Sequence, residues 1–209
     1  RRLAIIDLSK NGNQPMTLNN RFHIVFNGEI YNYIELKKEL IELGYKFITN
    51  TDTEVILIGY SHFGTDIFQK LNGMWGLVIY DQKSKKLIAS RDRFGEKPLY
   101  HLSVNGRILI SSEIKQLTPF LEKVEPNMRV IFNYLYIRQE DYSDETFFLK
   151  IKSFLPSHYY ELDTSKDNAN FSEHRYYSIR ENLENKRHVT EESFINSFKE
   201  SVKIRLRSD

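Results

Sequence analysis

A helical repeat of apolar residues defines the first clear element of the chain. The apolar positions lie three or four residues apart and would share one face: Leu36, Leu40 and Leu43. Asn32 precedes them as the expected N-cap, with Glu35 at capping-box spacing, and Gly44 is the expected stop. We therefore predict a helix that begins after Asn32 and ends before Gly44.

A second helix is predicted a few residues later. Thr51 and Glu54 again have the spacing of a capping box, and Gly64 is the expected stop. The apolar stripe of this helix would consist of Ile56, Tyr60 and Phe63.

Shorter apolar runs predict strands in the rest of the chain up to residue 162. The predicted strands cover residues 3–8, 22–26, 74–80, 87–90, 99–104, 107–111, 147–155 and 158–162. The polar turn 81–86 and the pair Asn105-Gly106 each connect two runs as a hairpin. Antiparallel sheet with helices grouped beside it indicates a layered α+β domain.

The last part of the chain is expected to begin a second domain. Residues 165–172 form a polar loop, and the charged stretch 180–187 is the best candidate for a linker. Thr190 would cap a final helix with one apolar face: Ile195, Phe198, Val202 and Leu206. This helix has nothing left to pack on, so we expect one domain over 1–179 and a truncated second domain over 188–209.

Composition removes several classes of function. Among 209 residues, 30 are Lys or Arg and 28 are Asp or Glu, a balance that gives no single-sign field for nucleic acid. No apolar run approaches the roughly 20 residues that cross a bilayer, so a cytoplasmic protein with no membrane partner is expected. Nucleic-acid binding would rest only on a pI of about 8.6 and on the number of tyrosines.

The chain contains no cysteine. Disulfides, thiolate metal sites and a cysteine nucleophile are therefore impossible within these residues. The six histidines are scattered without ligand spacing, so no metal site is expected. The chain also starts without Met inside an apolar run, which we interpret as a truncated start.

Four polar features could carry chemistry, and each has a simpler explanation. Arg2 could clamp a carboxylate, although from this residue alone a surface charge at a strand end is the favoured interpretation. Asn27 and Gly28, at the end of a predicted strand, could supply two N–H groups of an oxyanion hole, or could form an ordinary turn. Their neighbour Glu29 is a carboxylate at the same strand end.

Asp52 lies in the first turn of the second predicted helix. An acid there stabilises the helix dipole by about 0.3–1 kcal/mol and needs no ligand. Because Thr51 and Glu54 already form the capping box, Asp52 could instead bind a cation. With Glu29 and Arg2 it would suit a free amino acid, which offers one ammonium and one carboxylate.

The fourth feature is the run 91–100, in which alternating charges precede Gly95 and Pro98. We interpret it as a salt-bridged turn that is structural. The lone Trp75 and the Tyr-rich stretch 134–136 are interpreted as core or interface rather than as a platform for stacking bases.

Taken together, these motifs resemble the class II glutamine amidotransferases, and among them the asparagine synthetases. The matching motifs, dense over residues 1–117, are Arg2-Leu3-Ala4-Ile5-Ile6-Asp7, Gly12 with Gln14-Pro15-Met16, Phe26-Asn27-Gly28-Glu29-Ile30-Tyr31-Asn32, Thr51-Asp52-Thr53-Glu54-Val55, Leu71-Asn72-Gly73-Met74-Trp75, Arg91 to Tyr100 and Ser112-Glu113-Ile114-Lys115. Looser matches follow at Phe154-Leu155-Pro156 and Arg175-Tyr176-Tyr177.

The resemblance implies a fold and a site. The fold would be the four-layer αββα sandwich of the N-terminal nucleophile hydrolases, here without its first strand. An N-terminal Cys of the family attacks the glutamine amide and releases ammonia. The substrate carboxylate would be held by Arg2, with backbone groups of Leu3, Ile5 and Ile6. Asn27 and Gly28 would form the oxyanion hole, and Glu29 with Asp52 would bind the ammonium.

The resemblance also implies partners that these residues do not include. Ammonia would pass to the protein's own C-terminal synthetase domain, which uses ATP and Mg²⁺ to activate a carboxylate, typically that of aspartate. We expect no cofactor in this fragment, no glutamine hydrolysis by it alone, and a possible homodimer. The competing hypothesis is a relative that lost its nucleophile and only binds glutamine in a regulatory role.

Overall fold

The computed structural model describes residues 12–139, 142–166, 170–184 and 189–207. Its helices are α1 (Tyr33–Glu42), α2 (Asp52–Phe63), α3 (Ile67–Lys70), α4 (Met128–Ile137), α5 (Ile179–Glu184) and α6 (Glu191–Arg205). Its strands are β1 (Met16–Leu18), β2 (Phe22–Ile30), β3 (Gly73–Asp81), β4 (Lys86–Arg91), β5 (Tyr100–Val104), β6 (Arg107–Ser111), β7 (Ile151–Ser153), β8 (His158–Asp163) and β9 (Ser172–Arg175). None of these helices is long and apolar enough to cross a bilayer.

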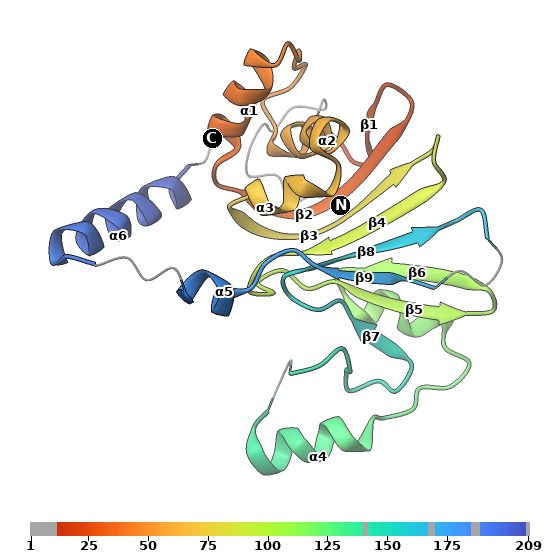
Figure 1. Cartoon of the computed structure of the whole chain (residues 1–209). Coiled ribbons are helices and arrows are strands. Elements are labelled where there is room, and N and C mark those ends of the chain that lie inside the picture. Colours follow the sequence, from red (N-terminus) through yellow and green to blue (C-terminus); the bar gives the residue numbers. More distant parts are fainter. Residues whose placement is uncertain (1–11, 140–141, 167–169, 185–188, 208–209) are drawn as a thin grey trace.

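The strands form two antiparallel sheets, as the predicted α+β class requires. Six strands follow the order β1-β2-β3-β4-β8-β9, and three follow the order β6-β5-β7. Helices α1, α2 and α3 cover one end of the larger sheet, while the smaller sheet lies on the other side (Figure 1). Two short 3-10 turns, Ile114–Gln116 and Thr118–Phe120, pack beside the smaller sheet and complete the layered arrangement.

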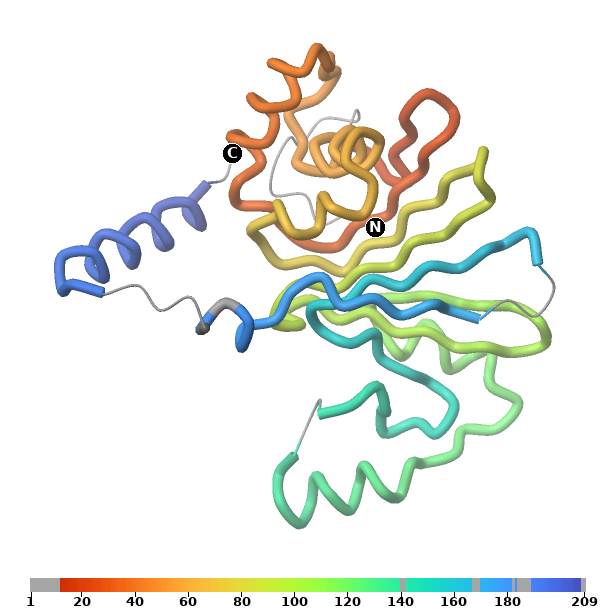
Figure 2. The backbone as a smooth tube through the Cα atoms, in the orientation of Figure 1, coloured from red at the N-terminus to blue at the C-terminus, as the bar shows by residue number. Residues whose placement is uncertain are grey.

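The main core lies between α2 and the larger sheet. Ile24, Leu77 and Ile79 from the sheet and Ile56 from α2 are at most 1% exposed. Trp75 is completely buried in the same core, as the sequence predicted, and its indole N–H donates to Ser90 Oγ. Figure 2 shows that β4 and β8, far apart in sequence, run side by side in the larger sheet.

The first predicted helix is confirmed, but its predicted capping box is wrong. Asn32 is the N-cap residue, yet its side chain makes no cap hydrogen bond. Instead its amide donates to Lys70 O and accepts from Asn72 N, at 2.9 and 2.8 Å. The Asn32 side chain therefore binds backbone groups about 40 positions further along the chain and does not cap the helix. Gly44 ends the helix with φ of +93°.

The second predicted helix is confirmed, but only one of the two hydrogen bonds of its predicted capping box forms. Thr51 accepts a hydrogen bond from Glu54 N, as expected. The Glu54 carboxylate turns to the preceding loop instead and accepts from the backbone of Ile48 and Thr49. The predicted stripe was too narrow, because α2 is buried on all sides from Asp52 to Gly59.

Both predicted hairpins are confirmed. β3 pairs with β4, and β5 pairs with β6 across Asn105 and Gly106, whose positive φ values of 50° and 70° suit a tight two-residue turn. The predicted strand 147–155 is shorter than expected, because only Ile151–Ser153 pairs in the sheet.

The C-terminal part differs from the prediction at one point. Residues 180–184 of the predicted linker belong to helix α5, and 185–188 lie outside the described residues. Helix α6 begins at the predicted cap, where Thr190 accepts from Ser193 N. Its apolar face is exposed: Ile195, Phe198, Val202 and Leu206. The Tyr-rich stretch 134–136 is also exposed on α4, so the core interpretation of it is wrong.

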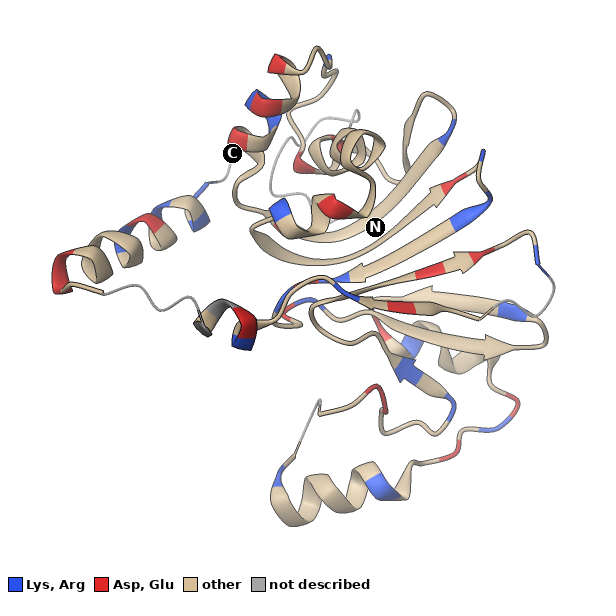
Figure 3. Cartoon of the chain, in the orientation of Figure 1, with Lys and Arg blue, Asp and Glu red and all other residues tan. Residues whose placement is uncertain are grey.

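Figure 3 shows basic and acidic residues interspersed over the helices, turns and strands. Basic residues are therefore not gathered in one element and acidic residues in another, which agrees with the weak case for nucleic-acid binding.

Candidate functional site

Strand β2 carries the centre of the candidate site. The predicted strand end at residue 26 is wrong, because β2 runs on through Asn27, Gly28 and Glu29 to Ile30 and stays paired with β3. The alternative of an ordinary Asn-Gly turn is thereby excluded. A Cβ at Gly28 would lie 2.1 Å from Met74 O, so only glycine fits against β3 at this place.

The outer edge of β2 directs a row of backbone N–H groups away from β3. In an antiparallel strand these groups alternate between the two sides. Phe26 N donates to the Gln14 side chain at 2.7 Å, and Ile30 N donates to Asp52 Oδ2 at 3.0 Å. By the same alternation the N–H of Gly28 lies on this edge between them. Trp75 lies opposite Gly28 on β3, and its backbone N–H donates to Asp92 Oδ2.

Asn27 and Glu29 are two residues apart on β2, so their side chains leave the same face of the strand. Glu29 is only 7% exposed. Asp52 arrives from the first turn of α2, where it is 6% exposed and accepts the hydrogen bond from Ile30 N. One carboxylate therefore comes from the sheet and the other from a helix N-terminus.

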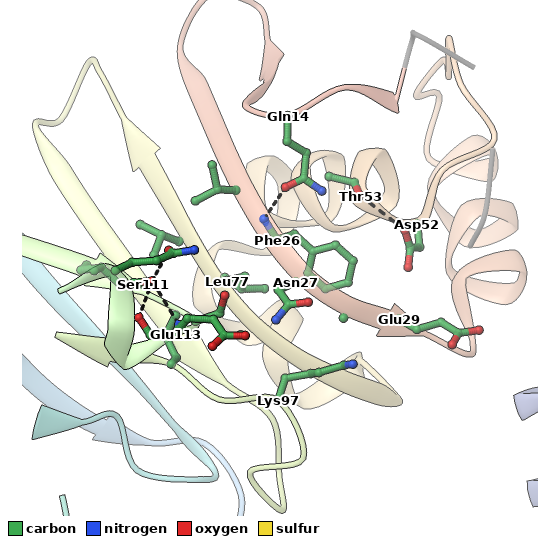
Figure 4. Close-up of a pocket in the computed structure, with 18 of the residues that line it drawn as sticks. Gln14, Phe26, Asn27, Glu29, Asp52, Thr53, Leu77, Lys97, Ser111 and Glu113 are labelled. Carbon is green, nitrogen blue, oxygen red and sulfur yellow. Dashed lines mark hydrogen bonds between the residues drawn. The ribbon is translucent and has the colours of Figure 1, made fainter. Parts of the chain in front are cut away.

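These side chains share one pocket. A cavity of about 910 Å³ is lined by Asn27, Gly28, Glu29 and Asp52, the four predicted site residues that the structure describes. Figure 4 shows Asn27, Glu29 and Asp52 around the end of β2. Gln14 and Thr53 lie on one side of them, and Ser111 and Glu113 on the other. Arg2, Leu3, Ile5 and Ile6 lie outside the described residues, so their predicted roles stay predictions.

Burial and charge act together on Glu29. Its pKa is raised above the usual carboxyl value, first by desolvation and then by the nearby negative charge of Asp52. The Lys97 ammonium acts in the opposite direction and lowers this pKa. An ammonium group bound between the two carboxylates would relieve both unfavourable effects.

Lys97 is a pocket residue that the sequence prediction missed. It lies in the run 91–100, in which Arg91 and Asp92 hold the turn together, in agreement with the predicted structural role of the run. The predicted salt-bridged turn has a different basis, however, because its two buried charged residues bind backbone groups. Asp92 accepts N–H bonds from Phe94, Glu96, Lys97 and Trp75, and Arg91 donates to the carbonyls of Gly95, Lys97 and Phe154.

The pocket can therefore bind a cationic group and an oxyanion side by side. Among the residues that the structure describes, no three His, Asp or Glu side chains are grouped closely enough to hold a metal ion. The chemistry available to the residues that line the pocket is that of carboxylates, amide N–H groups, hydroxyl groups and two lysines, Lys97 and Lys115.

Comparison with known proteins decides the family. The model of the glutamine amidotransferase domain matches residues 1–177. The chain belongs to this family. Among its relatives, the chain is similar to asparagine synthetase [glutamine-hydrolyzing] 1 of Bacillus subtilis, with 41% identity over 136 residues. That match covers 65% of the chain and 21% of the relative.

Two fungal relatives match the whole chain. Amidase chyE of Penicillium rubens is 33% identical over 216 residues, and amidase chry2 of Gibberella zeae is 32% identical over 217. Each match covers 100% of the chain and 31% of the relative. The chain thus spans between a fifth and a third of the length of these relatives.

Solved structures show the same fold at low sequence identity. The glutamine phosphoribosylpyrophosphate amidotransferase of B. subtilis, complexed with ADP and GMP, matches with a TM-score of 0.54 and 18% identity. This match covers 78% of the chain and 32% of that structure. The predicted fold of the N-terminal nucleophile hydrolase amidotransferases is thereby confirmed.

Proposed function

We propose that this chain is the glutamine-binding part of an amidotransferase that hydrolyses L-glutamine and supplies the ammonia to an ATP-activated carboxylate. The observation that carries the proposal is the shared pocket of Asn27, Gly28, Glu29 and Asp52. Two buried carboxylates suit the α-ammonium of an amino acid. The edge N–H of Gly28 and the amide of Asn27 suit an oxygen that becomes negative during the reaction.

In the proposed reaction a cysteine thiolate attacks the side-chain amide carbon of glutamine. The carbonyl oxygen becomes an oxyanion, which Asn27 and Gly28 would stabilise. Collapse of this intermediate breaks the C–N bond while the nitrogen takes up the proton that the base removed from the thiol, so that ammonia leaves and a glutamyl thioester remains. Water then hydrolyses the thioester to glutamate and regenerates the thiol. Glu29 and Asp52 would hold the α-ammonium throughout and keep the amide carbon in position.

The nucleophile has to come from outside these 209 residues, since they contain no cysteine. We propose that a cysteine at the N-terminus of the full-length protein supplies the thiolate and that its α-amino group serves as the base. Arg2 would then hold the substrate carboxylate, with backbone groups of Leu3, Ile5 and Ile6. The chain alone would bind glutamine without hydrolysing it.

The acceptor is proposed from the relatives. Relatives named asparagine synthetases favour aspartate, with ATP and Mg²⁺ bound by a synthetase domain that follows α6. The exposed apolar face of α6 supports the proposal that a second domain packs against this helix. The fungal amidases match more of the chain, so aspartate has to be tested against other carboxylate acceptors.

The deciding experiment measures ammonia release from L-glutamine by the full-length protein and by a variant with the N-terminal Cys changed to Ala. Release that disappears in the variant would support the proposal. Equal absence of release from both proteins, with glutamine binding retained, would favour the competing hypothesis of a regulatory module that binds glutamine without cleaving it.

A further inference from the structure

The backbone of Lys97 is fixed on both sides by buried charged residues. Its N–H donates to Asp92 Oδ2 at 2.9 Å, and its carbonyl accepts from Arg91 Nε at 2.9 Å. Asp92 is completely buried and Arg91 is 6% exposed. The next residue, Pro98, is packed directly on β3, where a Cβ at Gly76 would lie 2.9 Å from its carbonyl oxygen. The position from which the Lys97 side chain starts is therefore rigid.

The side chain of Lys97 enters the candidate site. It lines the same cavity as Glu29 and Asp52, and in Figure 4 it extends toward the end of β2, where Glu29 lies. Lys97 differs in this respect from exposed lysines such as Lys83 and Lys85. Its backbone is held by buried residues, and this determines where its ammonium group lies in the pocket.

The charged and titratable groups near Glu29 come from three elements. Asp52 approaches from α2, Lys97 from the loop before β5, and Tyr31 follows Glu29 at the end of β2. Two carboxylates in a buried pocket repel each other, and desolvation adds to the cost of ionising both. A nearby ammonium group offsets that cost. With Lys97 present, the two carboxylates and the lysine sum to one negative charge, which matches one α-ammonium.

We propose that Lys97 is a positioning residue of the glutamine site, whose ammonium group holds the Glu29 carboxylate ionised and in place before the substrate binds. The proposal rests on the proposed function for the identity of the substrate. Lysine suits this task because its flexible stem lets the charge move aside when the substrate's ammonium arrives. A guanidinium would be more rigid but would supply the same charge.

The first test needs only this chain. The carboxyl carbon of Glu29 is followed by NMR during a pH titration, with Glu29→Gln used to identify its signal. In Lys97→Met the titration midpoint of Glu29 should move to higher pH, whereas Lys97→Arg should retain the midpoint of the unchanged chain. Lys115→Met is the matched control: Lys115 lines the same cavity but pairs with Glu113 at 3.4 Å. An unchanged midpoint in Lys97→Met, or an equal change in Lys115→Met, would overturn the proposal.

The second test measures glutamine hydrolysis by the full-length protein. We expect Lys97→Met to raise KM several-fold, more strongly at pH 6 than at pH 8, with kcat nearly unchanged and with Lys97→Arg close to normal. A lower KM in Lys97→Met would mean that the lysine only repels the substrate, and would overturn the proposal. If the full-length protein hydrolyses no glutamine, the proposed function fails, and the titration still decides whether Lys97 controls Glu29.

Discussion

Arg207 and Glu35 lie 172 positions apart in the chain and form a two-pronged ion pair. Nη1 and Nη2 of the guanidinium lie 2.7 and 2.6 Å from the two carboxylate oxygens, and Nη1 also donates to Tyr31 O at 2.6 Å. Arg205 places its guanidinium 4.8 Å above the Tyr31 ring. The end of α6 is thus fastened to the junction of β2 and α1, two residues beyond Glu29.

Loss of the Arg207–Glu35 ion pair should increase local opening of α6 and leave the rest of the fold intact. The Glu35 side chain is 58% exposed, so the pair is expected to contribute no more than about 1 kcal/mol. In Arg207→Leu we therefore expect faster amide hydrogen exchange across α6 and little change in Tm. Lys199→Leu, on the same helix, is the control and should leave exchange unchanged. Unchanged exchange in Arg207→Leu would show that the pair does not hold the helix.

The same ion pair predicts that the free energy of unfolding depends on pH. The hydrogen bonds from Arg207 hold the pKa of Glu35 below its usual value in the folded protein. A carboxyl group with a lowered folded pKa stabilises the fold above its unfolded pKa, and this contribution disappears as the pH falls through the folded pKa. The difference in free energy of unfolding between the unchanged chain and Glu35→Gln should therefore be present at pH 7 and vanish in acid. A difference that persists or grows in acid would contradict the expected sign.

A stronger effect is expected at Asp81, which is only 5% exposed. It accepts two hydrogen bonds from Arg21, at 2.9 and 2.8 Å, and one from Ser84 Oγ, so its pKa is well below the usual range. Asp81→Asn should lower the free energy of unfolding at pH 7 by roughly 2 kcal/mol, since bonds to a charged group are lost. Denaturant unfolding would measure this, with Asp66→Asn as an exposed control that should change it little.

Local patterns predicted the elements well where the side chains had no distant competitor. The Thr51 cap, the Thr190 cap and the Asn105-Gly106 turn are set by neighbours within a few residues, and all three formed as predicted. Asn32 failed as a cap because its side chain instead donates to the carbonyl of Lys70 and accepts from the backbone N–H of Asn72. The continuation of β2 past Asn27 required β3 as a partner, which the local pattern does not contain.

The candidate site was predicted in part for the same reason. Asn27, Gly28, Glu29 and Asp52 were named from motifs, and the structure brings them into one pocket. The sequence prediction missed Lys97 because the charged run around it indicates a structural turn. That interpretation is right for the neighbours of Lys97, and only the packing of the loop on β3 shows that this one side chain enters the pocket.

Gly28→Ala tests the close contact of β2 with β3. The added Cβ would meet Met74 O, a backbone atom that cannot turn aside, so we expect a loss of roughly 3 kcal/mol or failure to fold. Gly106→Asn is the control: nothing lies within 4 Å of its Cβ, and asparagine tolerates the positive φ of 70° in a tight turn. Thermal unfolding would compare the two variants. A Gly28→Ala chain as stable as the unchanged one would mean that the strands separate easily there.

Asn27→Ala tests whether the amide acts on the transition state or on the bound substrate. In the full-length protein we expect kcat for glutamine hydrolysis to fall about 10²–10³-fold with KM nearly unchanged, the effect of removing one oxyanion-hole donor. Asp52→Asn should instead raise KM, because it removes one of the charges for the α-ammonium. Asn13→Ala is the matched control, since Asn13 lines the same cavity at its exposed rim. A rise in KM alone for Asn27→Ala would assign the amide to substrate binding and leave the oxyanion hole without its side-chain donor.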